Sequence, residues 1–161
     1  MLVNSLIFDA TGSNAYTYNN GNRRTGMTLT GTGSWSYAYD AVSRLTSTTN
    51  PYSETTTFSY DNANRQTGQV NANGSTVTNT YDNANRTTDV LHKTSASATL
   101  AHYSYAYDGV NNVTTRTDTD GTVTTFGCAN GGQVTSEVRG GGSAYTNSGQ
   151  PCSPPKVTPE P

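Results

Sequence analysis

The chain has too little apolar material for an ordinary globular core. Hydrophobic residues make up 31% of its 161 residues, and the mean hydropathy is −0.67. Low hydrophobicity by itself would favour disorder. The formal net charge is only −2, however, so charge repulsion adds little to that tendency. The sequence therefore predicts a polar fold that buries its few apolar groups on one face of a sheet.

The chain also lacks the marks of several functional classes. A net charge of −2 with a pI near 5.5 argues against a nucleic-acid surface, which needs a basic balance. No apolar run has the length of a membrane helix. The start of the chain, residues 1–8, has neither the basic region nor the long apolar segment of a signal peptide. We therefore expect no nucleic-acid partner and no membrane insertion.

Signals for catalysis or metal binding are equally sparse. His92 and His102 have no cysteine or carboxylate at metal-ligand spacing. Segment 118–121 begins like a calcium loop but lacks the later glutamate, and a hairpin turn explains it. The glycines at 140–142 are not followed by the Lys-Ser/Thr of a phosphate loop. We expect no catalytic residue, no metal and no cofactor.

What the chain does contain is one short motif that recurs every 21 residues. In the motif a tyrosine is followed by Asp or Asn, and an arginine stands four residues after that. The four regular copies hold Tyr18, Asn19 and Arg23; Tyr39, Asp40 and Arg44; Tyr60, Asp61 and Arg65; and Tyr81, Asp82 and Arg86. A fifth copy, with Tyr107 and Asp108, follows after a slip of five residues and has Asn112 in place of the arginine. A fixed period of this length indicates a repeat architecture built from small supersecondary units.

Each unit carries two turn signals. In the motif, the Asp side chain can cap a tight turn, and Ser, Asn or Gly three residues later accepts a positive φ. This pattern suits a type I turn followed by a left-handed bulge residue. The second signal lies 13 residues after the motif tyrosine, as at Asn73-Gly74 and Asp120-Gly121. Two turns in 21 residues leave roughly six or seven residues for each of two strands. The sequence therefore predicts an all-β chain of tandem antiparallel hairpins without helix.

The phase of the aromatic residues predicts a one-sided sheet. Tyr37 and Tyr39 stand two residues apart, like similar pairs in other units, so both rings point to one face. We expect Tyr39, Tyr60, Tyr81 and Tyr107 to lie beside one another across neighbouring units as a ladder of rings. The motif arginines either pair with an aspartate in the adjacent turn or lie flat on a tyrosine ring. Their recurrence in phase indicates a structural use.

The pattern Tyr-x-Tyr-Asp-x-x-Asn/Gly-Arg resembles the YD repeat of Rhs proteins over residues 16–138. Segment 105–122, with its motif at Tyr107 and its second turn at Asp120-Gly121, is especially close. Rhs proteins include bacterial polymorphic toxins, the cocoon-forming subunits of insecticidal Tc toxins, wall-associated proteins and teneurins. The resemblance implies an open, curved segment of a spiral sheet, which in those families forms a hollow shell around a toxin or a cell-surface scaffold. It also implies a secreted or cell-surface location.

The resemblance suggests three regions and two functional hypotheses. Residues 1–15 are a clipped repeat or N-terminal edge, 16–139 the YD-repeat array, and 140–161 a Gly/Pro-rich degenerate repeat with a flexible tail. A closed shell needs several times more repeats, so we expect a fragment or a short array. The first hypothesis is a non-catalytic structural region of a shell or scaffold that encloses or displays a toxin or effector. The alternative is a carbohydrate- or cell-surface-binding module, which needs tyrosine rings open to solvent.

The cysteines and the strand edges leave further alternatives open. Cys128, at a motif tyrosine position, and Cys152 are the only cysteines of the chain. A disulfide between them would tie the tail to the last good repeat, whereas an unpaired Cys128 would simply fill a tyrosine position. Unpaired strand edges recruit other strands. The expected partners are therefore the remainder of a longer Rhs-type chain or a second copy bound through these edges, with glycans as the alternative.

Overall fold

The computed structural model describes residues 2–9, 12–129 and 133–140, which contain strands and turns and no helix. The strands are β1 (Leu2–Asp9), β2 (Gly12–Tyr18), β3 (Arg24–Leu29), β4 (Gly33–Tyr39), β5 (Leu45–Thr49), β6 (Thr55–Tyr60), β7 (Gln66–Val70), β8 (Thr76–Tyr81), β9 (Thr87–Lys93), β10 (Thr99–Tyr107), β11 (Val113–Thr117), β12 (Val123–Cys128) and β13 (Val134–Arg139). The chain divides into two compact units, Met1–Thr76 and Val77–Pro161. The predicted division at residues 15 and 139 stays a prediction, and residues 141–161 lie outside the described part.

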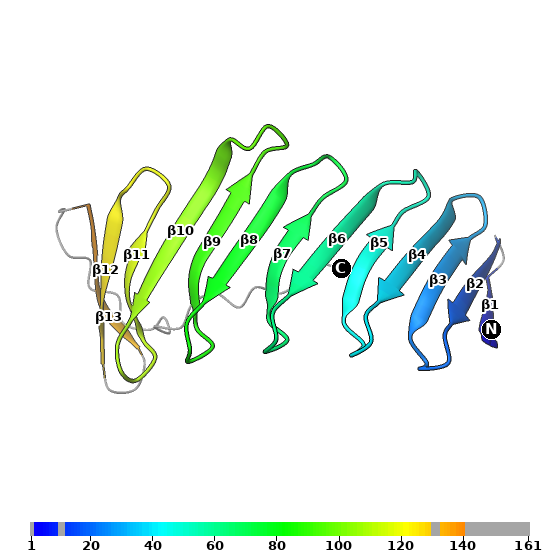
Figure 1. The fold of residues 1–161 in the computed structure, drawn as a ribbon, viewed down its shortest axis with the longest axis horizontal. Coiled ribbons are helices and arrows are strands. Elements are labelled where there is room, and N and C mark those ends of the chain that lie inside the picture. Colours follow the sequence, from blue (N-terminus) through cyan, green and yellow to red (C-terminus); the bar gives the residue numbers. More distant parts are fainter. Residues whose placement is uncertain (1, 10–11, 130–132, 141–161) are drawn as a thin grey trace. The chain divides into compact units, whose positions relative to one another are not determined.

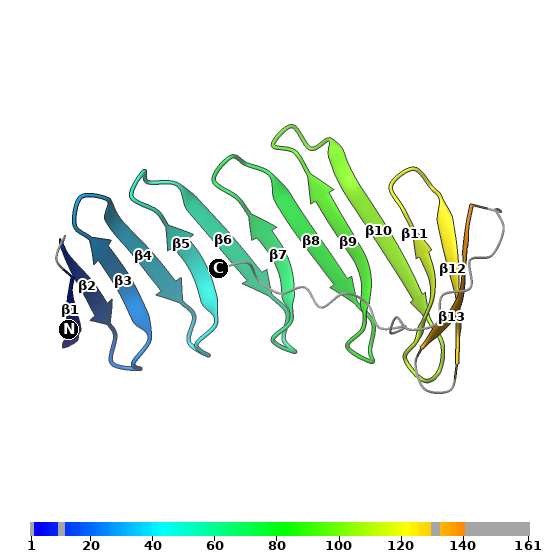
Figure 2. The ribbon, with the colours of Figure 1, turned by 180° about the vertical axis from the view of Figure 1, so that it is seen from behind.

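In each unit the strands follow one another in chain order as tandem hairpins (Figure 1; Figure 2 shows the reverse side). The first unit runs from β1 to β7 and the second from β8 to β13. The recorded pairs are antiparallel, as between β4 and β5 or between β11 and β12. The prediction of an all-β array of antiparallel hairpins is confirmed.

A similar five-residue turn closes hairpins at both ends of the strands, in the motif and in most of the second turns. In the motif turn, Asp40 N–H donates to Arg44 O at 3.0 Å, and Ser43 N–H donates to Asp40 O at 3.1 Å. In the second turn, Asn50 and Glu54 make the equivalent closing bond at 3.0 Å. The fourth residue of these turns has positive φ, at Asn22, Ser43, Ser53, Asn64, Gly74, Asn85, Ser97, Asn111 and Gly121. The β3–β4 turn differs, because its positive φ values fall at Gly31 and Gly33. These residue types tolerate the left-handed region, so the turn chemistry predicted from the sequence is confirmed.

A threonine forms a β-bulge next to each motif turn. Pairing between β4 and β5 passes from Ala38↔Ser47 to Tyr39↔Leu45, which leaves Thr46 as the extra residue. The equivalent extra residues are Thr25, Thr67, Thr114 and Thr135. A bulge increases the local twist and re-aims the neighbouring side chains. The bulge is therefore part of the repeat, like the motif itself.

In strands such as β4 and β6 one face is half-buried and the other is open to solvent, whereas β5 and β9 are half-buried at every position. In β4 the half-buried positions are Trp35, Tyr37 and Tyr39, and the alternating Ser34 and Ala38 are exposed. Among residues 14–129 and 133–140 only Asn79, Val113, Thr124 and Val134 are buried. The fold therefore has an aromatic face but almost no enclosed core. Polar contacts at the turns must carry an unusually large share of its stability.

The five-residue slip in the sequence lies at the second-turn end of β9 and β10. These strands have seven and nine residues, whereas β5 and β6 have five and six. Pairing passes from Thr99↔Lys93 to Ala101↔His92, so Leu100 is the one extra residue. The slip is thus two residues in each strand plus one bulge. Because side chains alternate with a period of two, this arrangement keeps the motif end of the hairpin in register.

Candidate functional site: the arginine-linked turns

Each motif aspartate caps its own turn and pairs with the arginine at the end of that turn. Asp40 Oδ1 accepts hydrogen bonds from Val42 N–H at 3.0 Å and from Arg44 N–H at 2.9 Å. Asp40 Oδ2 accepts one from Arg44 Nε at 2.6 Å. The corresponding ion pairs Asp61–Arg65 and Asp82–Arg86 are also 2.6 Å long. The Asp–Arg pair is therefore internal to one turn and not, as we expected, a link to an adjacent one.

These contacts keep the motif carboxylates ionised. The pKa of Asp40 lies below its ordinary value, chiefly because Arg44 N–H donates to the carboxylate; the Arg44 side chain adds to the effect and partial burial opposes it. The pKa values of Asp61, Asp82 and Asp108 are lowered by the same main cause. A carboxylate that accepts several N–H donors is stabilised in its charged form.

The same arginine also reaches the next motif turn along the chain. Arg44 Nη1 donates to Asp61 O at 2.9 Å and to Asn64 Oδ1 at 3.0 Å. Its guanidinium lies over the Tyr60 ring, 4.8 Å from the centroid. The Tyr60 hydroxyl in turn donates to Leu45 O at 2.8 Å. Two hydrogen bonds and a cation–π contact of one side chain thus link two successive repeats, while the ion pair of that side chain stays within its own turn.

The link recurs with the same geometry in both units, and we call it the arginine relay. Arg23 donates to Asp40 O and Ser43 Oγ, both at 3.0 Å, and lies 5.2 Å from the Tyr39 centroid. Arg86 Nη1 donates to Asp108 O at 2.9 Å and to Asn111 Oδ1 at 3.2 Å. Its guanidinium is 4.7 Å from the Tyr107 centroid.

The expected ladder of tyrosine rings therefore takes a different form. An arginine guanidinium, rather than another motif ring, lies over the rings of Tyr39, Tyr60 and Tyr107. Motif tyrosines stand on alternate strands, so about 10 Å separates their backbones. A guanidinium fits into this interval. Pairing with aspartate and stacking on tyrosine, which the sequence offered as alternatives, occur together.

The relay ends at the fifth motif. Asn112 Nδ2 donates to Asp108 Oδ2 at 2.9 Å, and this short side chain has no guanidinium with which to reach a further turn. Cys128 follows at the tyrosine position, and its Sγ lies 3.7 Å from Val113 O, the carbonyl that a motif tyrosine hydroxyl would bind. Cys152 lies outside the described residues, so its pairing with Cys128 stays a prediction.

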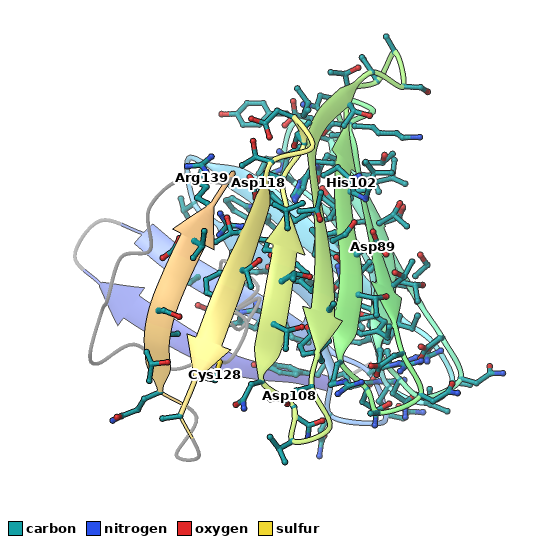
Figure 3. The ribbon with its side chains drawn as sticks, turned by 90° about the vertical axis from the view of Figure 1, so that its left-hand side faces the viewer. Asp89, His102, Asp108, Asp118, Cys128 and Arg139 are labelled. Carbon is teal, nitrogen blue, oxygen red and sulfur yellow. The ribbon has the colours of Figure 1, made fainter. Side chains whose placement is uncertain are left out.

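A second polar cluster lies on β9 and β10, on strands lengthened by the five-residue slip (Figure 3). Asp89 Oδ1 accepts a hydrogen bond from Ser104 Oγ at 2.7 Å and lies 2.9 Å from His102 Nε2. Burial raises the pKa of Asp89, but hydrogen bonds from Ser104, His102 and Thr80 outweigh it and hold the pKa below its ordinary value. Thr119 caps this part of β10, where its Oγ1 accepts from His102 N–H at 2.7 Å.

This cluster does not have the geometry of a nucleophilic triad. A triad places the histidine between serine and carboxylate, with one ring nitrogen toward each. Here the same ring nitrogen, His102 Nε2, faces both the serine and the carboxylate. It lies 3.4 Å from Ser104 Oγ, while that hydroxyl donates its hydrogen bond to Asp89. The serine is therefore not activated as a nucleophile. Within residues 2–9, 12–129 and 133–140, no group of three metal-binding side chains gathers.

The predicted turn at residues 118–121 has the expected form. Asp118 N–H donates to Thr122 O, and Gly121 N–H donates to Asp118 O, both at 2.9 Å. The Asp118 carboxylate accepts from Arg116 Nε at 2.7 Å and from Arg139 Nη2 at 3.4 Å. Hairpin closure and ion pairing account for these acidic residues, as the sequence indicated.

Comparison with known proteins agrees with this repeat geometry. The RHS Repeat family model matches residues 39–76 and 107–144, and each match begins at a motif tyrosine. These two stretches of the chain are Rhs/YD repeats. The resemblance stated from the sequence is thus confirmed. No curated protein matches the sequence.

The solved structures with a similar fold include crystal structures of TcdB2-TccC3-Cdc42, of TcdB2-TccC3, and of TcdB2-TccC3 without the hypervariable C-terminal region. Their TM-scores are 0.67, 0.66 and 0.67, with identities of 16%, 16% and 15%. Each match covers 78% of this chain and 7% of the other. The chain therefore shares its fold with a small part of much longer chains. Among the described residues no helix is long and apolar enough to cross a membrane.

The repeat family and its fold support a structural role for the chain as a repeat scaffold. The bulge threonine is the repeat residue that sequence reasoning missed. It stands seven residues after the motif tyrosine, at Thr25, Thr46 and Thr67, and the 21-residue phase was sufficient to reveal it.

Proposed function

We propose that this array is a non-catalytic segment of a longer Rhs-type shell that encloses or displays a toxin or effector, secreted or at the cell surface. The observation that carries the proposal is the arginine relay. Each relay arginine joins its own turn to the next one, as Arg44 does to Asp61 and Asn64. A shell wall made from a single sheet layer needs such links between successive repeats, since it has no second layer to pack against.

The chemistry of the motif supports a structural use. The Asp carboxylate, the Arg guanidinium and the Tyr hydroxyl of a motif satisfy one another or a neighbouring turn. Catalytic sites instead present groups with perturbed pKa toward an open pocket where a substrate can bind. The motif aspartates are held ionised by their own turns, and this suits a lasting cap rather than proton transfer.

The geometry gives no support to the carbohydrate-binding alternative. Stacking a sugar on tyrosine requires an accessible ring face, and guanidinium groups lie over Tyr39, Tyr60 and Tyr107. Tyr52 is 80% exposed, but it stands in a second turn outside the motif. Motif tyrosines are therefore parts of the wall and not a row of open platforms.

The enclosure proposal is tested by protecting a cargo from protease. The natural polypeptide that contains this segment would be treated with trypsin before and after mild urea, and its cargo domain followed by immunoblot. We expect the cargo to resist digestion until the array opens, and Arg44→Ala together with Arg86→Ala to lower the urea concentration at which protection is lost. A cargo equally sensitive with and without an intact array would refute enclosure. Binding of the isolated chain to a glycan array, abolished by changes at motif tyrosines but not by Tyr52→Ala, would favour the alternative.

A further inference from the structure

The first motif turn has the groups that elsewhere receive a relay arginine, but no arginine of the described residues occupies them. The Tyr18 ring, Asn19 O and Asn22 Oδ1 correspond in phase to the Tyr39 ring, Asp40 O and Ser43 Oγ, which bind Arg23. Asn22 has φ 56°, like Ser43 with φ 74°, so the turn has the same form. Among the described residues no guanidinium contacts these three groups.

The turn itself is complete without that arginine. Asn19 Oδ1 accepts hydrogen bonds from Gly21 N–H at 3.0 Å and from Arg23 N–H at 3.1 Å, as a motif aspartate would. Arg23 Nη1 is engaged with the following turn. The backbone of the turn, and with it Asn19 O, is therefore held in place, and a ligand would not have to order it. Preorganised groups of this kind bind at a lower entropic cost.

The sequence explains why this stretch of chain does not fill the site. Counting 21 residues back from Arg23 reaches Leu2, and the backbone of Leu2 pairs with Tyr18 across β1 and β2. The β3–β4 register, with Gly26 opposite Ser36, likewise places position 23 opposite Tyr39. Position 2 is thus the one from which a relay arginine would come, and leucine has no group that donates a hydrogen bond.

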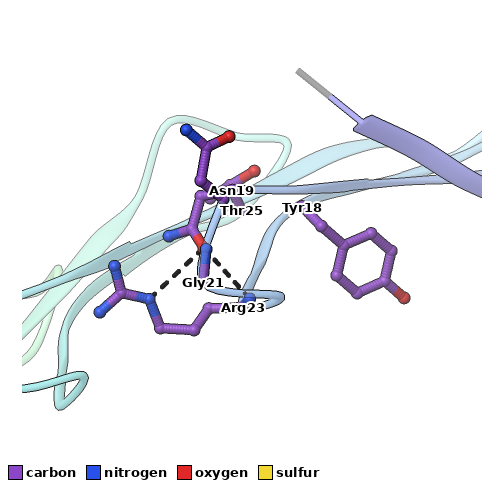
Figure 4. A pocket seen from close by; sticks show the side chains of 6 residues that line it. Tyr18, Asn19, Gly21, Arg23 and Thr25 are labelled. Carbon is purple, nitrogen blue, oxygen red and sulfur yellow. Dashed lines mark hydrogen bonds between the residues drawn. The ribbon is translucent and has the colours of Figure 1, made fainter.

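The surface at this turn is hollowed. An open depression of about 440 Å3 is lined by Tyr18, Asn19, Asn20, Gly21, Arg23 and Thr25 (Figure 4). Asn19 is neutral, so the charge of Arg23 is not balanced within the turn as that of Arg44 is by Asp40. A bare cation would meet this positive charge. An arginine already paired with its own aspartate, as in every regular motif with Asp, brings a compensating carboxylate.

We propose that Tyr18, Asn19 and Asn22 form a binding site for the arginine of a YD-type turn that belongs to another polypeptide chain. The ring would stack under the guanidinium, and the two oxygens would accept its Nη hydrogens. Lysine would fit poorly, since it has neither the planar fork nor the flat face. The site depends on the geometry of this turn and not on any cargo.

The test uses the peptide acetyl-Asp-Asn-Ala-Asn-Arg-amide, which has the sequence of residues 61–65. The peptide is titrated into the 15N-labelled chain and followed by NMR. We expect saturable shifts at Tyr18, Asn19 and Asn22, and affinity about tenfold lower for the same peptide ending in lysine, a loss equivalent to about 1.4 kcal/mol. Equal affinity for both peptides would show a general cation site and overturn the proposal.

Two variants supply matched controls. Arg23→Ala empties the site at Tyr39, which should then bind the peptide as a positive control. Leu2→Arg should fill the first site in cis and abolish binding there, whereas Leu2→Lys should leave most of it. Binding at Tyr39 in Arg23→Ala without binding at Tyr18 in the unmodified chain would overturn the proposal, as would no binding at either turn. None of these outcomes bears on cargo protection, so this proposal and the enclosure proposal fail separately.

Discussion

Removing one relay arginine should loosen the turn after it as well as its own. In Arg44→Ala, the two hydrogen bonds to Asp61 O and Asn64 Oδ1 are lost, each worth about 0.5–1.5 kcal/mol. The cation–π contact with Tyr60 adds about 0.5–1 kcal/mol at a site this exposed. The ion pair with Asp40 is partly solvated and adds little. We expect a loss of about 2 kcal/mol in local stability.

Native-state hydrogen exchange measures this loss residue by residue. The informative amides are Asp61 N–H and Asn64 N–H, which close the following turn. A loss of about 2 kcal/mol predicts roughly thirtyfold faster exchange there, because 1.4 kcal/mol corresponds to a factor of ten. Arg44→Lys should lose about half as much, since it keeps a charge but not the fork.

The control is Arg24→Ala, because Arg24 stacks on Tyr37 at 4.6 Å and its side chain donates no hydrogen bond to a later turn in the part of the chain that the structure describes. It should cost only about 0.5–1 kcal/mol. A double-mutant cycle of Arg44→Ala with Asn64→Gly isolates one hydrogen bond, since glycine keeps the left-handed turn. The relay is refuted if Arg44→Ala affects turn 61–65 no more than Arg24→Ala does, or if the cycle shows no coupling.

Three further predictions concern acid, glycine and cysteine. The motif carboxylates have lowered pKa values, so their contribution to folding stability is complete above about pH 3.8, the unfolded value, and is lost as the pH falls through the lower folded pKa. Melting temperatures measured from pH 2 to 7 should fall with this loss, and the fall should be smaller in Asp61→Asn. A pH profile of Asp61→Asn identical to that of the unmodified chain would count against the assigned caps. Gly33→Ala should lower the free energy of unfolding in urea by about 1–3 kcal/mol, because φ is 120° and the new Cβ would lie 2.5 Å from a proline ring. Gly31→Ala should cost less, because its new Cβ would meet no atom within 4 Å. Equal losses in the two variants would contradict the steric reason. We also predict a Cys128–Cys152 disulfide, so a thiol assay without reductant should find no free thiol, and two reactive thiols would exclude the bond.

The sequence predicted local features better than contacts between repeats. Positive φ at Ser43 or Asn64 and capping by Asp40 depend on neighbours within one turn, so residue type decides them. The reach of Arg44 to Asp61 depends on strand spacing and bulge geometry, which the sequence does not state. The phase of the tyrosines predicted a continuous stack of rings, whereas the structure has a guanidinium over Tyr39, Tyr60 and Tyr107.

The cluster of Asp89, His102 and Ser104 was not predicted for a related reason. These residues lie in strands altered by the five-residue slip, so no other repeat offers a copy for comparison. Pairing across β9 and β10 depends on where Leu100 bulges, and this choice is not visible in the periodicity. The threonine bulges, by contrast, were fully in phase and were overlooked.

In the lengthened β9–β10 hairpin, the end with the motif turns keeps its geometry, and the end with the second turn takes up the extra residues. Arg86 and Asp108 are 22 residues apart and Arg44 and Asp61 only 17, yet both arginines bind the next carbonyl at 2.9 Å. The motif turns thus keep the same link across this hairpin, and its extra residues lie toward the opposite margin. Insertions there should keep the alignment if they add an even number of residues, or an odd number with a bulge. New loops can therefore arise on that margin while the spacing of the motif turns stays constant.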